Sequence, residues 1–454
     1  MSKTIFLRTR ILLILAALLA SPLTGQQQKL TLQQAVAAAL EHNPTRKIAI
    51  AETASAAAGF RLSKTSLFPQ IQFSENLTRG DDPVYAFGTK LRQKVFQTSD
   101  FSLGGLNRPS PLGDFNTSFS GRWVAFDSLH TQFQIKRAWL IKQGAEASAG
   151  RTSQEVIYHV VEAYESVLVS AREVEVARHA AETAEALFNE SRARVKAGLA
   201  VESDSLSSQV NLAARQQELI RAQGAVQISW SELEAAVGTA LPQGAEGLEQ
   251  LVERDFSAPA LAEEVEQAFK NRPDLKSLGL QISAQQAAVR SVKAEFGPRV
   301  GAFGSWQSDR PSLARSGGSN WMAGAELRID LLPLEKRSRL QQEKASLLRA
   351  QAGEQAALSI IRVEVSRAYF SHQSAAKMVE VARGSMEQAA ESLRILRNRY
   401  DAGLVPLTDV LRAEDAEHQS QSSYWQAVYH SALSYAALRL ATGTLNAEQV
   451  VNFQ

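Results

Sequence analysis

The stretch NRYDAGLVPLTDVLRAE, residues 398–414, decides how this chain is organised, because it interrupts a long helical pattern and restarts it within a few residues. Gly403 suits the C-terminus of a helix, where the backbone commonly turns left-handed. Thr408 and Asp409 are residue types that cap the start of a helix. The stretch therefore predicts one helix that stops at Gly403 and a second that starts at Thr408 or Asp409.

The same break occurs a second time, in RARVKAGLAVESDSLSSQ at residues 192–209. Here Gly198 follows the first helix, and Ser203 or Asp204 is the candidate cap. Other pairs keep fixed offsets along the chain: 229 residues for Asn43-Pro44 with Arg272-Pro273, and 205 for Tyr164 with Tyr369 and Gly238 with Gly443. Internal similarity at fixed offsets indicates a tandem duplication. The expected domains are a signal peptide (1–25), a first repeat (26–238), a linker (239–260), a second repeat (261–443) and a C-terminal tail (444–454).

The N-terminus has the pattern of an exported protein. Lys3, Arg8 and Arg10 precede a short apolar run from Ile11 to Ala20, which is typical of a bacterial secretory signal peptide. The alternative is a membrane anchor, but the run is short for a membrane-spanning helix. We expect cleavage between Ala20 and Gln26, and a mature chain without a transmembrane helix.

Composition limits the chemistry available to the chain. It has no cysteine, so thiolate metal sites, cysteine nucleophiles and disulfides are excluded. A formal net charge of +2 over 454 residues argues against a nucleic-acid partner. The seven histidines lack metal-binding spacing, and no catalytic motif is present. We therefore expect no enzyme activity, no metal site and no cofactor, and we expect His372 to be a packing or hydrogen-bonding residue.

Each repeat contains a long helical segment with small apolar residues in alternating steps of three and four. This spacing is the heptad seam of a coiled coil, and its alanines predict closely packed helices. The alternative is an amphipathic helix on an ordinary core. The longest segment, about 131–196, would span on the order of 100 Å as one helix. The first seam comprises Val156, Val160, Ala163, Val167, Ser170, Val174, Ala177, Ala181, Ala184 and Phe188. The second comprises Ile361, Val365, Ala368, His372, Ala375, Val379, Ala382, Met386, Ala389, Leu393, Leu396 and Tyr400.

Strand patterns occur only in the middle of each repeat. NWMAGAELRID (320–330) and NTSFSGRWVAF (116–126) alternate apolar and polar residues, and QIQFSENL (70–77) and VGAFGSWQSD (300–309) do so more weakly. Strands of about ten residues with this alternation and with aromatic residues are typical of transmembrane barrels. A soluble β-sandwich is the alternative. Because known barrels have at least about eight strands, four per chain could close one only if several chains contributed.

In the order and spacing of these features the chain resembles the TolC family of outer-membrane efflux proteins. The resemblance covers nearly the whole mature chain and rests on LTLQQAVAAALEHNP (30–44), WVAFD (123–127), LRID (327–330), the two Ala-Gly-Leu breaks and LATGTLN (440–446). It implies a mainly α fold with a small β part. In that fold long antiparallel coiled-coil helices form a periplasmic tunnel, joined to a four-strand contribution to a shared transmembrane β-barrel. It also implies a homotrimer that is embedded in outer-membrane lipid.

The resemblance further implies an outer-membrane channel of a tripartite efflux or type I secretion system in a Gram-negative-type bacterium. The channel would be a passive conduit from an inner-membrane transporter and a periplasmic adaptor, the membrane fusion protein, to the exterior. The two breaks would be the turns of helical hairpins at the periplasmic end of the tunnel. The alternative is a secreted periplasmic coiled-coil scaffold without a pore.

Carried over residue by residue, the resemblance marks two sets of sites in these turns. Tyr400 and Asp409 match positions of the periplasmic gate, and Arg412 occupies a position where the family archetype has an acid. The alternative for the turn residues is plain capping without a partner. The adaptor-docking candidates are Ala197, Gly198, Leu199, Ala402, Gly403 and Leu404.

Overall fold

The computed structural model describes residues 29–241, 244 and 247–453. The predicted signal peptide lies outside these residues. The described chain forms two compact units. Unit 1 comprises residues up to Pro44, Gln154–Leu261 and from Ser366 onward, and unit 2 comprises Thr45–Ser153 and Ala262–Val365. Each unit combines segments of both sequence repeats, and the predicted domain boundaries stay a prediction.

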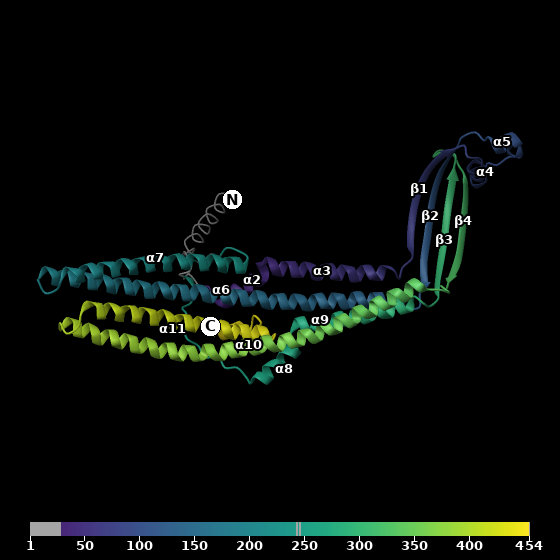
Figure 1. Ribbon diagram of the computed structural model, residues 1–454. Coiled ribbons are helices and arrows are strands. Elements are labelled where there is room, and N and C mark those ends of the chain that lie inside the picture. Colours follow the sequence, from purple (N-terminus) through teal and green to yellow (C-terminus); the bar gives the residue numbers. More distant parts are fainter. Residues whose placement is uncertain (1–28, 242–243, 245–246, 454) are drawn as a thin grey trace, which may run out of the picture. The chain divides into compact units, whose positions relative to one another are not determined.

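Unit 2 contains an antiparallel sheet with the order β1-β2-β3-β4 and the helices that lead into and out of it (Figure 1). The strands are β1 (Gln70–Gly80), β2 (Leu112–Phe126), β3 (Arg299–Arg310) and β4 (Gly318–Arg328). All four strands expected from the alternating pattern are therefore confirmed. The helices α3 (Pro44–Thr65) and α9 (Pro273–Ala294) lead into β1 and β3, and α8 (Leu261–Asn271) precedes α9.

Two long helices follow the second strand of each pair and contribute to both units. They are α6 (His130–Lys196), with 67 residues, and α10 (Leu334–Asp401), with 68. Helices α4 (Pro83–Arg92) and α5 (Leu103–Asn107), with the short 3-10 helix η1 (Thr98–Phe101), occupy the β1–β2 connection. None of the helices in the described part of the chain has the length and hydropathy that a membrane crossing requires.

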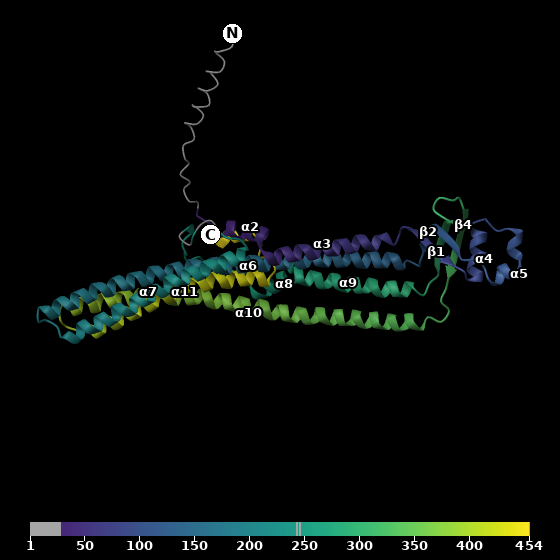
Figure 2. The ribbon, with the colours of Figure 1, turned by 90° about the horizontal axis from the view of Figure 1, so that it is seen from above.

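Unit 1 is built on two helical hairpins. The C-terminal part of α6 pairs with α7 (Glu202–Val237), and the C-terminal part of α10 pairs with α11 (Leu407–Ala441). The two hairpins lie side by side in both ribbon views (Figures 1 and 2). Helix α2 (Leu32–His42) and the C-terminal 3-10 helix η3 (Gln449–Phe453) complete the unit.

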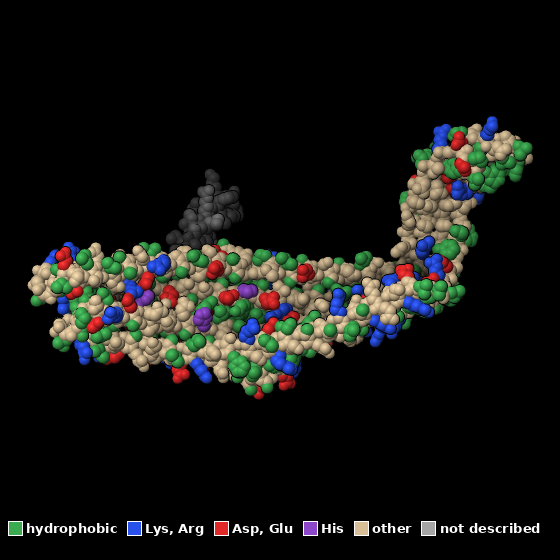
Figure 3. All heavy atoms as spheres, in the orientation of Figure 1, with side chains coloured by type: hydrophobic (Ala, Val, Ile, Leu, Met, Phe, Trp, Pro, Cys, Tyr) green, Lys and Arg blue, Asp and Glu red, His purple; other side chains and the backbone are tan. Residues whose placement is uncertain are grey.

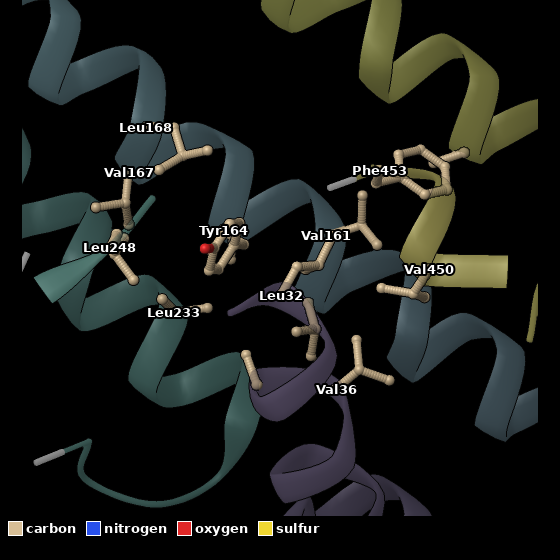
Figure 4. Close-up of a cluster of buried hydrophobic side chains, with 14 of the residues drawn as sticks. Leu32, Val36, Val161, Tyr164, Val167, Leu168, Leu233, Leu248, Val450 and Phe453 are labelled. Atoms are coloured by element: carbon tan, nitrogen blue, oxygen red, sulfur yellow. The ribbon is translucent and has the colours of Figure 1, made fainter. Parts of the chain in front are cut away.

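The core of unit 1 joins segments that are far apart in sequence. In Figure 4, Leu32 and Val36 of α2, Tyr164 of α6, Leu233 of α7 and Phe453 near the C-terminus belong to one cluster of buried side chains. The Tyr164 hydroxyl donates a hydrogen bond of 2.8 Å to the Leu30 carbonyl, which satisfies its polar end inside the core. The predicted linker contributes Leu248 and Leu251 to the same cluster.

The predicted heptad seams are the inward faces of the long helices. In the first seam Val160, Val167 and Ala184 are buried, and in the second Ile361, Val365 and Val379 are buried. Every other seam residue is buried or half-buried. The prediction of a sustained apolar seam in both repeats is thus confirmed.

Both repeats also break a helix before a proline. Asn43 separates α2 from α3, and its side-chain amide donates 2.7 Å to the Ala236 carbonyl of α7. Arg272 separates α8 from α9 and pairs at 2.6 Å with Glu364 of α10. Thr31 forms a capping box with Gln34 at the start of α2.

Candidate functional site

The two hairpin turns end their first helices in the same way. Gly198 and Gly403 have φ values of +75° and +71°, in the left-handed region. The Leu199 amide donates 2.9 Å to the Arg194 carbonyl, and the Leu404 amide donates 2.9 Å to the Arg399 carbonyl. This is the Schellman arrangement, which satisfies carbonyls left free at a helix end. The prediction that both glycines terminate a helix is confirmed.

The predicted caps of the returning helices are wrong. Helix α7 begins at Glu202 and α11 at Leu407, so the capping positions are Val201 and Pro406, and neither makes a side-chain capping bond. Ser203, Asp204, Thr408 and Asp409 instead lie inside the first turn. The reason is that both helices start earlier than polar residue types alone suggest. At the third helical position, Asp204 and Asp409 interact favourably with the helix dipole.

The turns expose apolar side chains. Leu199 is 79% exposed and Leu404 is 73% exposed, and Ala197 and Ala402 are exposed beside them. No atom would meet a Cβ added at Gly198 or Gly403, so the backbone angle and not crowding demands glycine there. Each hairpin therefore ends in a small apolar tip.

A single arginine joins the two hairpins next to these tips. The guanidinium of Arg194 on α6 lies 4.6 Å from the ring centre of Tyr400 on α10, and Nη1 donates 3.3 Å to the Tyr400 carbonyl. Its Nη2 lies 3.2 Å from Oδ1 of Asp401 and 2.7 Å from Oε1 of Glu190. The stacked ring and the carboxylates fix the guanidinium in place.

Tyr400 is part of a buried apolar cluster. Its side chain is 6% exposed and packs with Leu187, Leu407 and Val410. Burial raises the pKa of its phenol, although the Arg194 charge opposes that effect. Of the two other proposed gate residues, the half-buried Asp409 in the first turn of α11 lies 3.7 Å from the exposed Arg412 in the next turn.

Polar contacts between the hairpins continue along α7 and α11. Arg215 of α7 pairs with Asp415 of α11, and Asn211 of α7 donates 3.4 Å to Glu414 of α11. Glu414 also faces Arg397 of α10 at 3.9 Å. Burial raises the pKa of the Glu414 carboxyl, while Arg397 and Arg215 lower it.

Sequence reasoning missed Arg194, Arg215 and Glu414. A signal existed for the first: the repeats differ where Lys196 in one corresponds to Asp401 in the other, which creates the acid that Arg194 contacts. Away from these contacts, the face of the molecule drawn in Figure 3 is mixed in charge. Figure 3 shows acidic and basic side chains interspersed over the helices.

The second candidate site is the sheet, whose register separates two faces. Side chains alternate between faces along each strand, and directly paired residues share a face. The polar face carries Gln70, Gln72, Ser74, Asn76, Thr78, Asp114, Asn116, Ser118, Ser120, Arg122, Arg299, Ser305, Gln307, Asp309, Asn320, Glu326 and Arg328, with Leu112, Val124, Phe303 and Met322 as its apolar members. The apolar face includes Ile71, Phe73, Phe119, Trp123, Phe126, Val300, Ala302, Trp306, Trp321, Ala323, Ala325 and Leu327.

An aromatic row crosses the apolar face. Phe73, Phe119, Trp306 and Trp321 are paired in sequence from β1 to β4. The ring centres of Phe73 and Phe119 are 5.1 Å apart, and those of Phe119 and Trp306 are 6.1 Å apart. Such rows mark the level where a barrel surface meets the lipid headgroups.

The rows on either side of the aromatic row differ in polarity. Toward the β1–β2 connection, Arg310 contacts Thr117 at 2.6 Å and Glu75 at 3.4 Å. Toward the long helices the face stays apolar. Near β2's end a register shift between Val124 and Phe126 returns Phe126 to this face, opposite Val300. The apolar band is therefore bounded at the end where the loops lie.

His372 behaves as a structural residue, as predicted. Its Nδ1 lies 3.2 Å from the Ser434 hydroxyl, and its Nε2 lies 3.0 Å from the Phe256 carbonyl. Within the described residues, no group of three or more histidine or acidic side chains could hold a metal ion.

A family model described as "outer membrane efflux protein" matches residues 35–239 and 265–444. The two matched segments follow the two sequence repeats and span most of the chain. The chain therefore belongs to the outer membrane efflux protein family.

Relatives with named roles agree with this assignment. The alkaline protease secretion protein AprF of Pseudomonas aeruginosa is 22% identical over 418 residues, covering 90% of this chain and 83% of that protein. The probable efflux pump outer membrane protein TtgC of Pseudomonas putida is 23% identical over 179 residues, covering 38% of this chain and 37% of that protein.

Solved structures share the fold. The CmeC outer membrane channel of Campylobacter jejuni matches with a TM-score of 0.76 at 17% identity, covering 92% of this chain and 88% of that one. The MtrE channel of Neisseria gonorrhoeae matches with a TM-score of 0.75 at 16% identity, covering 92% and 90%. The resemblance to the TolC family and the expected fold class are thus confirmed.

The protein is an outer-membrane efflux channel with periplasmic helices, and no observation favours a scaffold without a pore. Family and fold are those of channel proteins and not of enzymes.

Proposed function

We propose that three copies of this chain share one twelve-stranded barrel, and that this barrel continues the passage that their helical hairpins enclose. In this arrangement the polar face of each sheet lines the lumen, and the apolar face contacts outer-membrane lipid. The trimer is a passive conduit, and energy comes from an inner-membrane transporter.

The single observation that supports this proposal is the two-faced sheet with its aromatic row. Within the described residues the outer edges of β1 and β4 pair with no other strand. An open edge in lipid would leave backbone groups without hydrogen-bond partners, each at a cost of several kcal/mol. Edge pairing between copies removes that cost. The number three comes from the family resemblance, because edge pairing alone would also allow two or four copies.

The hairpin tips are the proposed contact with the periplasmic adaptor. Leu199 and Leu404 offer exposed apolar side chains on rigid turns, with Ala197, Gly198, Ala402 and Gly403 around them. Apolar anchors of this kind suit a partner with a small apolar groove. The adaptor would connect the channel to the transporter, which completes a tripartite efflux or type I secretion system.

The cluster around Tyr400 is the proposed gate. Tyr400 connects the second hairpin to the first through Arg194. Asp409 lies in the first turn of α11, and Arg412 is its ion-pair partner in the next turn. Opening would separate these contacts. Cargo passing through such a lumen needs only to tolerate a polar wall, so drugs, metals, polysaccharides and polypeptides all suit it.

Native mass spectrometry in detergent tests the assembly. We expect a trimer, and a monomer as the main species would contradict the shared barrel.

A second experiment tests which face of the sheet lines the lumen, with the substitutions Gln72→Cys and, at the neighbouring residue, Phe73→Cys in the cysteine-free chain. A water-soluble maleimide should reduce channel current through Gln72→Cys and leave Phe73→Cys unchanged, and the reverse pattern would overturn the assignment of the polar face to the lumen.

A further inference from the structure

The connection between β1 and β2, residues 81–111, is a folded element. Its counterpart between β3 and β4 is only residues 311–317. Asp82 caps α4 through a 2.8 Å bond from the Tyr85 amide. Phe96 packs edge-on against Phe87 at 4.8 Å and Phe101 at 5.2 Å between ring centres.

An ion pair adds to this small core. Lys90 of α4 lies 2.7 Å from Asp100 of η1, and the Asp100 carboxylate also accepts 2.8 Å from the Gln97 amide. The segment therefore has its own aromatic and ionic contacts, and α4 is held as a unit with η1.

Two glycines show which face of the sheet α4 covers. Gly80 and Gly318 belong by register to the polar face, in line with Thr78 and Asp309. A Cβ at Gly80 would lie 3.7 Å from the Tyr85 ring, and a Cβ at Gly318 would lie 2.0 Å from the Arg92 carbonyl oxygen. The backbone at the end of α4 thus presses against the polar face, where only glycine leaves room for it.

Hydrogen bonds fasten α4 to the same face. Gln93 is almost fully buried, and its Nε2 donates 2.9 Å to Asp114 and 2.9 Å to the Gly113 carbonyl. Asn320 donates 3.3 Å to the Arg92 carbonyl. The Arg92 guanidinium lies 3.8 Å from Asp309, which is itself fully buried. The three strand side chains in these contacts all belong to the polar face.

We propose that residues 83–107 fold inward over the polar face and narrow the extracellular exit of the channel. This inference rests on the proposed barrel, in which the polar face lines the lumen. Three copies would then surround the exit. Val84, which is 81% exposed, and Leu91, which is 49% exposed, would present apolar side chains to the passage. Apolar constrictions resist wetting and so limit the flow of ions and polar cargo.

The absence of cysteine from the chain allows a direct test with single thiols. Trimers carrying Val84→Cys or Leu91→Cys are inserted in planar bilayers and treated with a bulky polyethylene-glycol maleimide from the side of the loops. We expect stepwise loss of single-channel current as the thiols react. The matched control is Leu77→Cys, which is 68% exposed on the opposite face of the sheet near the same end. Its modification should leave the current unchanged.

A second variant removes the side-chain hydrogen bonds between the end of α4 and the sheet. Gln93→Ala combined with Asn320→Ala should raise single-channel conductance above that of the wild type, because α4 loses its side-chain bonds to the sheet. If the current is unchanged after modification of both Val84→Cys and Leu91→Cys, with labelling verified by mass, the proposal that residues 83–107 fold inward over the polar face is overturned. A wild-type protein that forms no trimer and no channel would instead overturn the proposed function, so the two failures are distinct.

Discussion

Arg194 and Tyr400 connect the two hairpins of one chain, with the guanidinium 4.6 Å from the ring centre and Nη1 3.3 Å from the tyrosine carbonyl. Because Tyr400 is buried with Leu187, Leu407 and Val410, this contact holds the end of α10 against α6 and the start of α11. Any motion that moves the second hairpin away from the first has to break it.

Arg194→Ala should loosen this end of the second hairpin. Loss of the cation–π contact and of the charged hydrogen bonds should cost about 1–2 kcal/mol locally. That cost corresponds to about 5- to 30-fold faster amide hydrogen exchange at residues 397–404. Single-channel conductance should rise at the same time. Arg192→Ala removes the same charge from an exposed position two residues earlier and should change neither measurement. Equal exchange rates in the two variants would contradict a joining role for Arg194.

Glu165 of α6 makes stability depend on pH. The carboxylate is completely buried, and Arg254 of the linker faces it at 3.6 Å. Burial raises the pKa of Glu165 to about 7, with Arg254 opposing and Glu249 adding to that effect. Tyr164 and Tyr429 are the other titratable groups near it.

The direction of the pH effect follows from linkage. The folded chain holds this proton more tightly than the unfolded chain, in which the pKa is near 4.5. Unfolding free energy should therefore fall as pH rises from about 4.5 to about 7, by up to about 3 kcal/mol. Glu165→Gln should be more stable than the wild type at pH 8 and similar to it below pH 4.5. Denaturant unfolding across this range checks the prediction, with exposed Glu182→Gln as the control. Parallel pH curves for the wild type and Glu165→Gln would refute it.

Ala181 tests the close packing of the first seam. It is buried on α6, so Ala181→Leu should overpack the interface and cost about 1–3 kcal/mol. The temperature at which the trimer dissociates should fall accordingly. Ala193→Leu places the same side chain at an exposed position of the same helix and should have little effect. If both variants dissociate at the wild-type temperature, the seam has room that the alanines do not indicate.

Periodicity predicted most of the fold. The alternation in NWMAGAELRID gave β4, and the three-four spacing from Val156 to Phe188 gave the buried face of α6, because both depend on which side of an element is covered. Helix ends at Gly198 and Gly403 were also predictable, since a left-handed residue has few alternatives to glycine.

The start of α11 and the contacts between the hairpins were not predictable in this way, because they depend on residues that are distant in sequence. The start of α11 at Leu407 was missed because Val410 and Leu407 pack against Leu187, and this packing decides the first turn more than the polar residues Thr408 and Asp409 do. Arg194 was missed because its partner Asp401 is 207 residues away. Local sequence does not indicate such a pair, and only the comparison of the two repeats, in which Lys196 corresponds to Asp401, singles out the acid.

Asp409 tests the proposed gate. It lies in the first turn of α11 beside Arg412, where its charge favours the helix dipole by about 0.3–1 kcal/mol. Loss of that amount leaves the trimer intact. Asp409→Ala should raise single-channel conductance, because it weakens the start of α11 next to the Tyr400 cluster. Asp204→Ala is the matched change at the corresponding position of the first hairpin and should have a smaller effect. Identical conductance in both variants and the wild type would remove Asp409 from the gate.

Gly403 tests adaptor docking at the tip of the second hairpin. Its φ of +71° is strained for any residue with a Cβ and most of all for a β-branched one, whereas no neighbouring atom restricts the space. Gly403→Val should therefore distort the turn that presents Leu404, and binding to the adaptor protein should weaken while the trimer remains assembled. Leu404→Ala removes the exposed side chain without changing the backbone and should weaken binding as well.

The control for Gly403→Val is Gly384→Val, which places the same residue inside α10, where a Cβ meets no atom, and should leave binding intact. Surface-immobilised adaptor gives the three affinities. If Gly403→Val and Leu404→Ala bind like the wild type, the turn only closes the hairpin, and adaptor contact has to lie elsewhere on the helices.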